Sequence, residues 1–459
     1  MENLTQGSIP RHIIKLAIPI AIGMIFQTLY HLVDLYFVAK MGDSAIAGLT
    51  SAGTISFLVM AFTQVIGVGT MALIAQASGR KDQTDANLIF NQSLGLAAVC
   101  ALLTLAGGYS LTGWYMGTLG ADTDTVNAGT QYLWWVLPGL SLQFALVCMG
   151  SALRGTGIVK PAIYVQVFTV TLNAALAPFM IDGWVTGRPL GVVGAGLSTS
   201  ISISVGVLVL FLYFVRLERY VTFRSDQLRP RWNTWKRILY IGVPPGGEFV
   251  MMFFYMAVIY WAIRDFGPAA QAGFGAGSRV MQAIFLPAMA IAFATAPVSS
   301  QNVGARQNER VRETYRWAVL AGGAIMLMLT LLCQLRPELL VSQFTDDIAV
   351  IVVGGEFLQI ISWNFVATGF IFTCSSLFQA LGNTVPTLLA SATRLVSFAI
   401  PAVLLSRWAG FELHHLWYLS VATVVLQAIT SWWLLRIEFR RKLGPSKELG
   451  LARSVEGTQ

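Results

Sequence analysis

The feature that most constrains this chain is its succession of long apolar runs separated by short charged segments. A helix needs roughly 20 apolar residues to cross the hydrocarbon core of a bilayer, where no water can satisfy its backbone. Only 11% of the residues are charged, against about 25% in soluble domains. We therefore predict an all-α polytopic membrane protein with twelve transmembrane helices. Their expected ranges are 13–39, 50–78, 88–117, 129–153, 160–181, 190–215, 238–263, 270–300, 315–335, 349–380, 385–406 and 414–436.

Several functional classes are disfavoured by what the sequence lacks. The first apolar run is long enough to span and follows a short polar N-terminus, so we expect no cleavable signal peptide. All four cysteines fall inside predicted spans, which argues against a disulfide framework and a metal site. No G-x-x-x-x-G-K-[ST] loop is present, and no H-E-x-x-H or G-x-S-x-G motif falls in a span. We expect no enzyme activity, no cofactor and no metal, so any transport would use an ion gradient or the membrane potential.

Lys and Arg are distributed unequally between the two sides of the predicted topology. With the N-terminus in the cytoplasm, the termini and even-numbered loops hold 23 of the 30 Lys and Arg residues, and the opposite loops hold 5. Because cytoplasmic loops are enriched in these residues, we expect both termini in the cytoplasm and the protein in the inner membrane. This asymmetry accounts for the net charge of +8, so we expect no nucleic-acid partner.

The chain also matches itself at one constant shift, the shift that carries Pro19 onto Pro244. The same shift pairs Gly42 with Gly267, Thr70 with Thr295, Gln76 with Gln301, Gly157 with Gly382, and Pro161 with Pro386. Each half then holds six spans in the same orientation, which predicts two six-helix lobes related by a pseudo-two-fold axis along the membrane normal. Repeats of this kind usually flank a central site, although a duplicated channel would give the same pattern.

We place the domain boundaries where the composition changes. The expected parts are an N-terminal lobe at 1–215, a basic cytoplasmic linker at 216–237, a C-terminal lobe at 238–440 and a cytoplasmic tail at 441–459.

Four stretches resemble the multidrug and toxic compound extrusion (MATE) family, and the DinF-like branch is one candidate within it. "QTLYHLVDLYFVAKMG" (27–42) resembles the family's Q-x-x-Y-N-x-V-D-x-x-F-V-G-x-x-G first helix, with His31 in place of the usual Asn. "ALRGTGIVKP" (152–161), "GVPPGGE" (242–248) and "SRVMQAIFLPAMAIAFATAPVSSQNVGA" (278–305) resemble further family motifs. The resemblance covers nearly the whole chain. It implies two six-helix lobes around a cavity, and export of a bulky substrate against entry of protons or sodium ions.

Asp34 is the main candidate for coupling to an ion. An ionised carboxylate is costly inside a membrane, so an acid in a span is a functional hypothesis by default. Its repeat equivalent is Ile259, which favours a dedicated ion site over a packing role needed in both lobes. Desolvation also suits a carboxyl group to proton uptake and release. His31 lies three residues earlier on nearly the same helix face and could share the proton, or could be a polar packing residue.

The resemblance implies a second ion ligand in the fifth span, and here the sequence departs from the family. "TLNAALAPF" (171–179) resembles N-x-x-x-D-P, but Ala177 replaces the acid. Asn173 and Thr199 remain as neutral oxygen donors. Since sodium prefers several oxygen ligands and one charged ligand is missing, we expect coupling to H⁺ rather than Na⁺.

Five residues are expected to line the substrate cavity: Gln27, Tyr30, Glu248, Arg279 and Arg394. Glu248 could bind a cationic substrate, or its charge could be balanced by Arg279 or Arg394. We expect a monomeric antiporter, surrounded by membrane lipids, that exports small organic compounds, chiefly cations. A lipid or lipid-linked glycan flippase is the first alternative and would need more cavity cations than these two arginines. A passive channel is the second alternative and would need no titrating acid.

Overall fold

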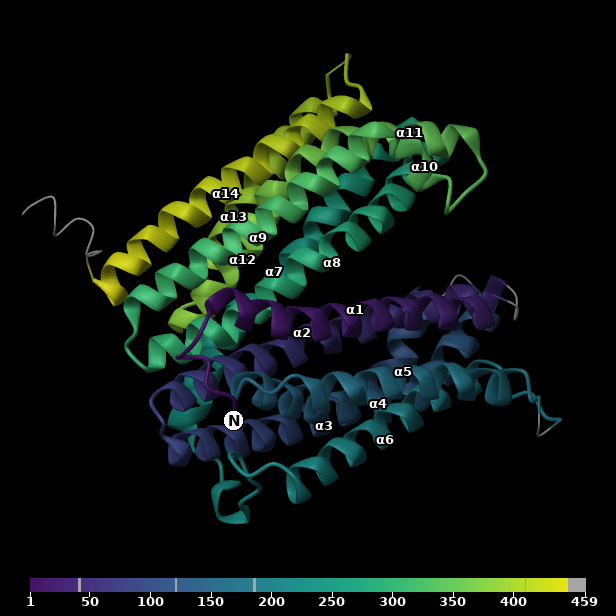
Figure 1. Cartoon of the computed structure of the whole chain (residues 1–459). Helices are drawn as coiled ribbons and strands as arrows, with labels where there is room; N and C mark the ends of the chain where they lie inside the picture. The colour runs from purple at the N-terminus through teal and green to yellow at the C-terminus, as the bar shows by residue number, and fades with distance from the viewer. Residues whose placement is uncertain (40–42, 120–121, 185–186, 409, 445–459) are drawn as a thin grey trace, which may run out of the picture. The chain divides into compact units, whose positions relative to one another are not determined.

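The computed structural model describes residues 1–39, 43–119, 122–184, 187–408 and 410–444. Among residues 30–39 and 43, only the side chain of Phe37 is described. The described part consists of helices joined by short connections and contains no strand (Figure 1).

The first half of the chain forms six long helices. They are α1 (Ile9–Ala39), α2 (Asp43–Gly79), α3 (Gln83–Leu119), α4 (Thr123–Gly155), α5 (Lys160–Ile181) and α6 (Val192–Arg216). A linker that contains the short helix η1 (Ser225–Gln227) leads to the second half. The helices of that half are α7 (Trp232–Ile263), η2 (Arg264–Phe266), α8 (Pro268–Gly304), α9 (Asn308–Leu335), α10 (Pro337–Val341), α11 (Ile348–Ile361), η3 (Ser362–Asn364), α12 (Phe365–Leu381), α13 (Val385–Leu405) and α14 (Leu413–Leu443).

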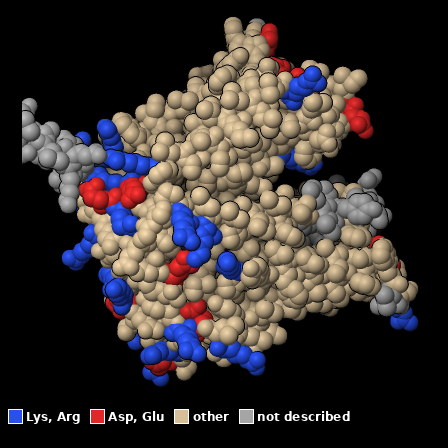
Figure 2. All heavy atoms as spheres, viewed as in Figure 1, with Lys and Arg blue, Asp and Glu red and all other residues tan. Residues whose placement is uncertain are grey.

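Twelve helical segments of the described residues are long and apolar enough to cross a membrane. The predicted all-α polytopic fold is therefore confirmed. The tenth predicted span is not one regular helix, because α11, η3 and α12 together make up Ile348–Leu381. Figure 2 shows charged side chains gathered towards the helix ends, with a broad uncharged surface between them.

The internal repeat is visible in where the helices begin. The starts of α2, α3, α4 and α5 at 43, 83, 123 and 160 correspond to the starts of α8, α9, α11 and α13 at 268, 308, 348 and 385. Every pair differs by the same shift that carries Pro19 onto Pro244. The two halves therefore repeat the same local structure as well as a set of matching residues.

The turns repeat as well. Lys81 and Arg306, which are equivalent by this shift, are the two non-glycine residues with positive φ among those described, at 60° and 58°. Gly157 and Gly382 are also equivalent, with φ of 81° and 71°, in a region that glycine enters without a Cβ clash. In both halves an aspartate caps the next helix. Asp122 accepts from the N–H of Thr125, and Asp347 accepts from that of Ala349.

The chain forms two compact units whose boundaries fall inside two long helices. The first unit comprises Met1–Asn3 and Ile18–Gly246, and the second comprises Leu4–Ala17 and the chain from Gly247 onward. Helix α1 passes from one unit to the other beside Pro19, and α7 does so just after Pro244 and Pro245. The first unit thus extends past the expected boundary at 215 and includes the whole expected linker.

Amide side chains of α3 bind the backbone of the linker and hold it against that helix. The four residues are Gln83, Asn87, Asn91 and Gln92. Gln83 donates to the carbonyl of Tyr220 at 2.9 Å, Asn87 accepts from the N–H of Thr222 at 2.7 Å, and Gln92 accepts from that of Arg231 at 2.7 Å. Because Gln83, Asn87 and Asn91 are four residues apart, they follow one another along one face of the helix.

Within the first unit, α2 and the first part of α7 approach closely through glycines. A Cβ atom placed on Gly242 would overlap the carbonyl oxygen of Val65, and one placed on Gly69 would overlap that of Ile238. Small residues allow backbones to come this close in membrane helices, where van der Waals packing replaces the hydrophobic driving force. These contacts explain why the start of α7 belongs to the first unit.

We expect Gly242→Ala to destabilise the first unit, because the added methyl group meets backbone atoms that cannot rotate away. Overpacking of this kind costs about 1–3 kcal/mol. Gly53→Ala is the matched control, since Gly53 is exposed on α2 and a Cβ there would have no neighbour within 4 Å. The measurement is the thermal unfolding midpoint in detergent, which should fall for Gly242→Ala and stay level or rise for Gly53→Ala. Equal midpoints for the two variants would contradict the close approach.

Candidate functional site

The predicted site residues fall into two groups, one in each unit. Those on α1, α5 and α6 belong to the first unit, and those on α7, α8 and α13 belong to the second. Each group is described on its own.

Asp34, His31 and Tyr30 lie in α1, but their side chains are outside the described residues. Their neighbour Phe37 is described and lies one turn after Asp34. It packs against a small cluster that contains Ala177 and Ala195. This part of α1 therefore lies beside α5 and α6, the helices that carry the other predicted ion-site residues.

Asn173 and Thr199 form the buried polar contact that joins α5 to α6. The Asn173 amide donates to the Thr199 hydroxyl oxygen at 3.1 Å, and that hydroxyl donates to the carbonyl of Ala195 at 3.1 Å. Asn173 is 1% exposed and Thr199 6% exposed, so both are withdrawn from solvent. The Thr199 hydroxyl thus already uses its hydrogen and one lone pair within the protein.

Ala177, which stands where the family resemblance implies an acid, is completely buried. It is four residues after Asn173 and therefore on the same side of α5. Its neighbours Ile181 and Ala195 are also buried and apolar. A carboxylate at this position would have to be neutral or paired, whereas alanine needs no partner.

Gln27 is the other described α1 residue of the predicted cavity lining. Its side-chain oxygen accepts from the amide of Gln166 on α5 at 3.2 Å. A Cβ atom on Gly23, one turn earlier, would also lie 3.0 Å from the Gln166 side chain. Gln166 therefore packs against α1 at Gly23 and Gln27.

In the second unit, Glu248 on α7 faces α13. Its carboxyl group has a side-chain hydrogen bond with Thr387, and its Oε1 atom is buried without a protein partner. The Thr387 hydroxyl also has the carbonyl of Thr384 as an acceptor at 2.7 Å. The Thr387 hydroxyl has one hydrogen and can therefore donate to only one of these two acceptors at a time.

Among the described residues, no ion pair joins Glu248 to Arg279 or Arg394. The guanidinium carbon of Arg394 instead lies 4.3 Å from the centroid of the Tyr255 ring, within cation–π distance. Its Nε atom is buried without a hydrogen-bond partner. Arg279 on α8 is exposed, and no described contact joins it to Glu248 or Arg394.

Other polar side chains complete the second group. The Tyr255 hydroxyl is hydrogen-bonded to the hydroxyl of Ser420 at 2.8 Å, and the Gln427 amide donates to the hydroxyl of Ser391 at 3.3 Å. Gln427 Oε1 has no protein partner. Helices α7, α13 and α14 thus enclose carboxyl, guanidinium, amide and phenol groups, two of which retain unsatisfied buried oxygens.

The sequence analysis did not predict four residues that contribute to these groups. They are Gln166, Tyr255, Ser391 and Gln427. An amide inside an apolar helix is the signal that could have marked Gln166 and Gln427, because such a group needs a partner away from water. Tyr255 carries a weaker signal, as the repeat equivalent of the predicted Tyr30.

Comparison with known proteins gives a consistent result. The MatE family profile matches residues 19–179 and 244–404, two segments related by the same shift as the internal repeat. The chain is 23% identical over 426 residues to the probable multidrug resistance protein YoeA of Bacillus subtilis (strain 168), and the match covers 91% of each chain. It is 24% identical to the multidrug export protein MepA of Staphylococcus haemolyticus (strain JCSC1435), over 82% of this chain and 83% of that protein.

A solved structure agrees with these matches. It is described as the outward-facing conformation of a multidrug resistance MATE family transporter of the MOP superfamily. The fold superposes on it with a TM-score of 0.89 at 25% identity, covering 96% of this chain and 98% of the other.

We expect Thr199→Val to lower the thermal unfolding midpoint more than Thr199→Ser. The valine variant keeps the side-chain shape but removes the hydroxyl that accepts from Asn173, and an unmet buried hydrogen bond costs about 1–3 kcal/mol. The serine variant keeps the hydroxyl and is the matched control. If both variants unfold at the wild-type temperature, the Asn173–Thr199 contact is not a stabilising one.

Proposed function

The chain belongs to the MATE family of membrane transporters, and on this premise we propose that it is an antiporter of the inner membrane that exports organic cations in exchange for protons. Two of its relatives are named a probable multidrug resistance protein and a multidrug export protein, which supports drug efflux as the general activity. The proposal adds the coupling ion, the charge of the substrate, the cytoplasmic position of both termini and the roles of individual residues.

The observation that carries proton coupling is the buried Ala177, which stands where the family resemblance implies a second acid. In the first unit this leaves Asp34 as the single acid of the proposed ion site. One carboxyl group is enough to bind and release a proton. A sodium ion needs several oxygen ligands, and a single carboxylate supplies at most two of them.

A preference for cations is supported by the second unit. Glu248 carries a buried carboxyl oxygen without a protein partner, and no described ion pair neutralises it. A cationic substrate could supply the missing donor. Of the two arginines predicted in this group, Arg394 is engaged with the ring of Tyr255 and Arg279 is exposed. This polarity is the reverse of what a flippase of pyrophosphate-linked lipids would need, so we rank that function second.

Asp34→Asn tests the mechanism because the amide imitates a permanently protonated carboxyl group. We expect this variant to insert and fold, and to lose efflux driven by a pH gradient in proteoliposomes. Ligands shift a conformational equilibrium only through different affinities for its states, and a group that cannot release its proton supplies no such difference. Asp122→Asn is the matched control, because it makes the same change at a helix cap outside the proposed site.

Three outcomes would contradict parts of this proposal. Full pH-driven efflux in Asp34→Asn would remove Asp34 from the mechanism. Wild-type efflux under a sodium gradient alone would overturn the proton assignment. Continuous ion conductance through the wild-type protein, without coupled substrate movement, would favour a channel.

Glu248→Gln should keep gradient-driven efflux and change substrate preference. The glutamine amide can donate to Thr387, so the contact between α7 and α13 persists, while the negative charge is lost. We expect the KM for a dicationic dye to rise by about tenfold, and that for a neutral dye to change little, since one charge-assisted contact is worth about 1.4 kcal/mol or more. An equal loss for both dyes would indicate a structural role for Glu248.

A further inference from the structure

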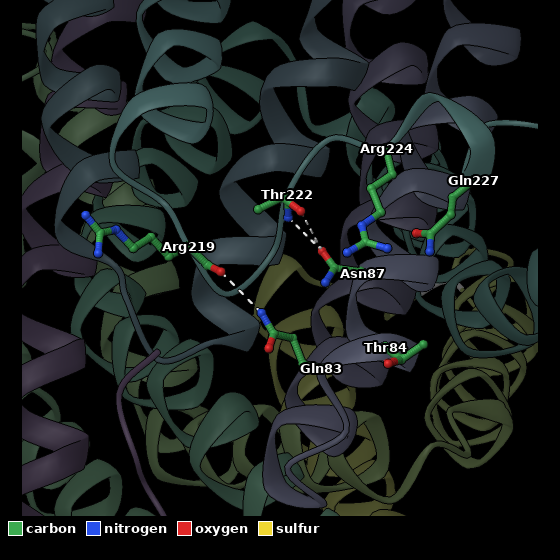
Figure 3. Close-up of a pocket in the computed structure, with 7 residues that line it drawn as sticks. All are labelled: Gln83, Thr84, Asn87, Arg219, Thr222, Arg224 and Gln227. Carbon is green, nitrogen blue, oxygen red and sulfur yellow. Dashed lines mark hydrogen bonds between the residues drawn. The ribbon is translucent and has the colours of Figure 1, made fainter.

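A polar pocket in the first unit has no part in the proposed transport mechanism. It has a volume of about 260 Å³ and lies between the start of α3 and the linker that follows α6 (Figure 3). The lining residues are Gln83, Thr84, Asn87, Arg219, Thr222, Arg224 and Gln227. Every one of them carries a polar side chain, which is unusual for a hollow in a protein this apolar.

The walls of the pocket are held in place without a ligand. Gln83 donates to the carbonyls of Arg219 and Tyr220 at 3.2 and 2.9 Å. Asn87 accepts from the N–H of Thr222 at 2.7 Å, and Gln227 accepts from the amide of Asn91 at 3.3 Å. The linker is therefore fixed to α3 on both sides of the hollow. A ligand that enters would lose little binding energy to ordering the chain.

These same bonds leave the pocket rich in hydrogen-bond donors. The side-chain oxygens of Asn87 and Gln227 already accept from protein groups. The guanidinium group of Arg224 has only donors to offer, and the Thr84 hydroxyl can donate as well. Figure 3 shows the Arg224 side chain extending towards Asn87, whereas that of Arg219 extends away from the other labelled residues. Such a lining suits an anion that has several acceptor oxygens.

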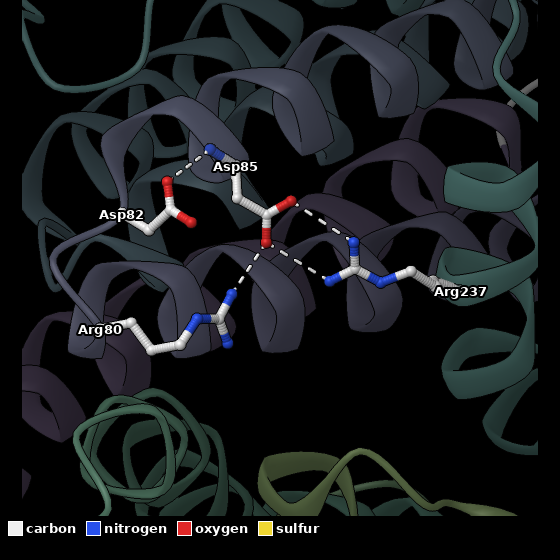
Figure 4. A network of polar contacts seen from close by, with 4 residues as sticks. All are labelled: Arg80, Asp82, Asp85 and Arg237. Atoms are coloured by element: carbon white, nitrogen blue, oxygen red, sulfur yellow. Dashed lines mark hydrogen bonds and ion pairs between the residues drawn. The ribbon is translucent and has the colours of Figure 1, made fainter.

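The charge of these arginines is not balanced by the neighbouring acids. Asp85 is occupied by Arg80 at 2.8 Å and by Arg237 at 3.4 Å (Figure 4). The buried Glu218 accepts from the N–H of Tyr220 at 2.9 Å. Asp226 is exposed on η1. Among the described residues, no ion pair joins either Arg219 or Arg224 to a carboxylate.

The pocket lies where the chain leaves the predicted membrane. Arg219 follows three residues after the end of α6, and α7 begins at Trp232. Exposed arginines next to a span attract anionic headgroups. We propose that this pocket binds a phosphoryl group, carried either by an anionic phospholipid headgroup or by a phosphate compound in solution. A guanidinium group matches the oxygens of a phosphate in a bidentate manner, which is why arginine is favoured at such sites.

The test uses the purified full-length chain and compares variants that lose the same charge. Arg219→Gln/Arg224→Gln removes the two pocket arginines. Arg229→Gln/Arg231→Gln removes two exposed arginines of the same linker whose side chains do not line the pocket. Arg219→Lys/Arg224→Lys keeps the charge and loses the bidentate geometry.

Two ligand sources are compared by isothermal titration and by thermal unfolding. One arm uses inorganic phosphate against chloride at equal ionic strength, in neutral detergent. The other uses phosphatidylcholine vesicles with and without phosphatidylglycerol. A response in the first arm identifies a site open to dissolved phosphate. A response in the second arm alone identifies a lipid headgroup site.

We expect binding to the wild type and to Arg229→Gln/Arg231→Gln, about tenfold or more weaker binding to Arg219→Gln/Arg224→Gln, and intermediate binding to the lysine variant. Equal losses in the two glutamine variants would mean that only the general basic surface attracts anions, and would overturn the site. So would the absence of a response in both arms. The inference does not depend on which ion drives transport.

Discussion

Hydrocarbon offers no hydrogen-bond partner to a peptide group, and the arrangement of polar residues in this chain follows from that fact. Many hydroxyl side chains of the spans donate to a carbonyl of their own helix. Thr70 and Thr295, which are repeat equivalents, donate to carbonyls four residues earlier at 2.7 Å in each case. Other polar side chains reach between helices, and the contact of Asn173 with Thr199 is one of these.

Much of the fold could be predicted because it is duplicated and strongly patterned. One constant shift predicts the starts of four helices in the second half from those in the first. The break at Ser362–Asn364 in the tenth span contains neither Gly nor Pro, so it lacks the usual signal of a helix break. Nor does the pattern reveal that the start of α7 packs with the first unit. That depends on whether Gly242 meets Val65, which is a long-range contact that periodicity does not encode.

The candidate site was predictable to a smaller extent. The sequence analysis named Asn173 and Thr199 as oxygen donors of one site, and their two side chains are in contact. It could not decide how Glu248 is balanced, because two arginines were available in the same half. The preference of Arg394 for the face of Tyr255 depends on side-chain directions that spacing alone does not give. The surroundings of the Asp34 side chain stay a prediction.

The duplication itself argues that the two units have different roles. Where the first unit has Asn173, the second has Phe398, which is fully buried against Tyr255. Where the second has Glu248 and Arg394, the first has Gly23 and Thr169. The backbones repeat, so folding did not require these differences. A buried polar group is costly unless it is paired. Each unit nevertheless has polar or charged side chains at positions where the equivalent residue of the other unit is different. That divergence is what a transporter needs if its driving ion and its substrate occupy separate sites, because coupling then acts through the conformation of the chain and not through competition for one group.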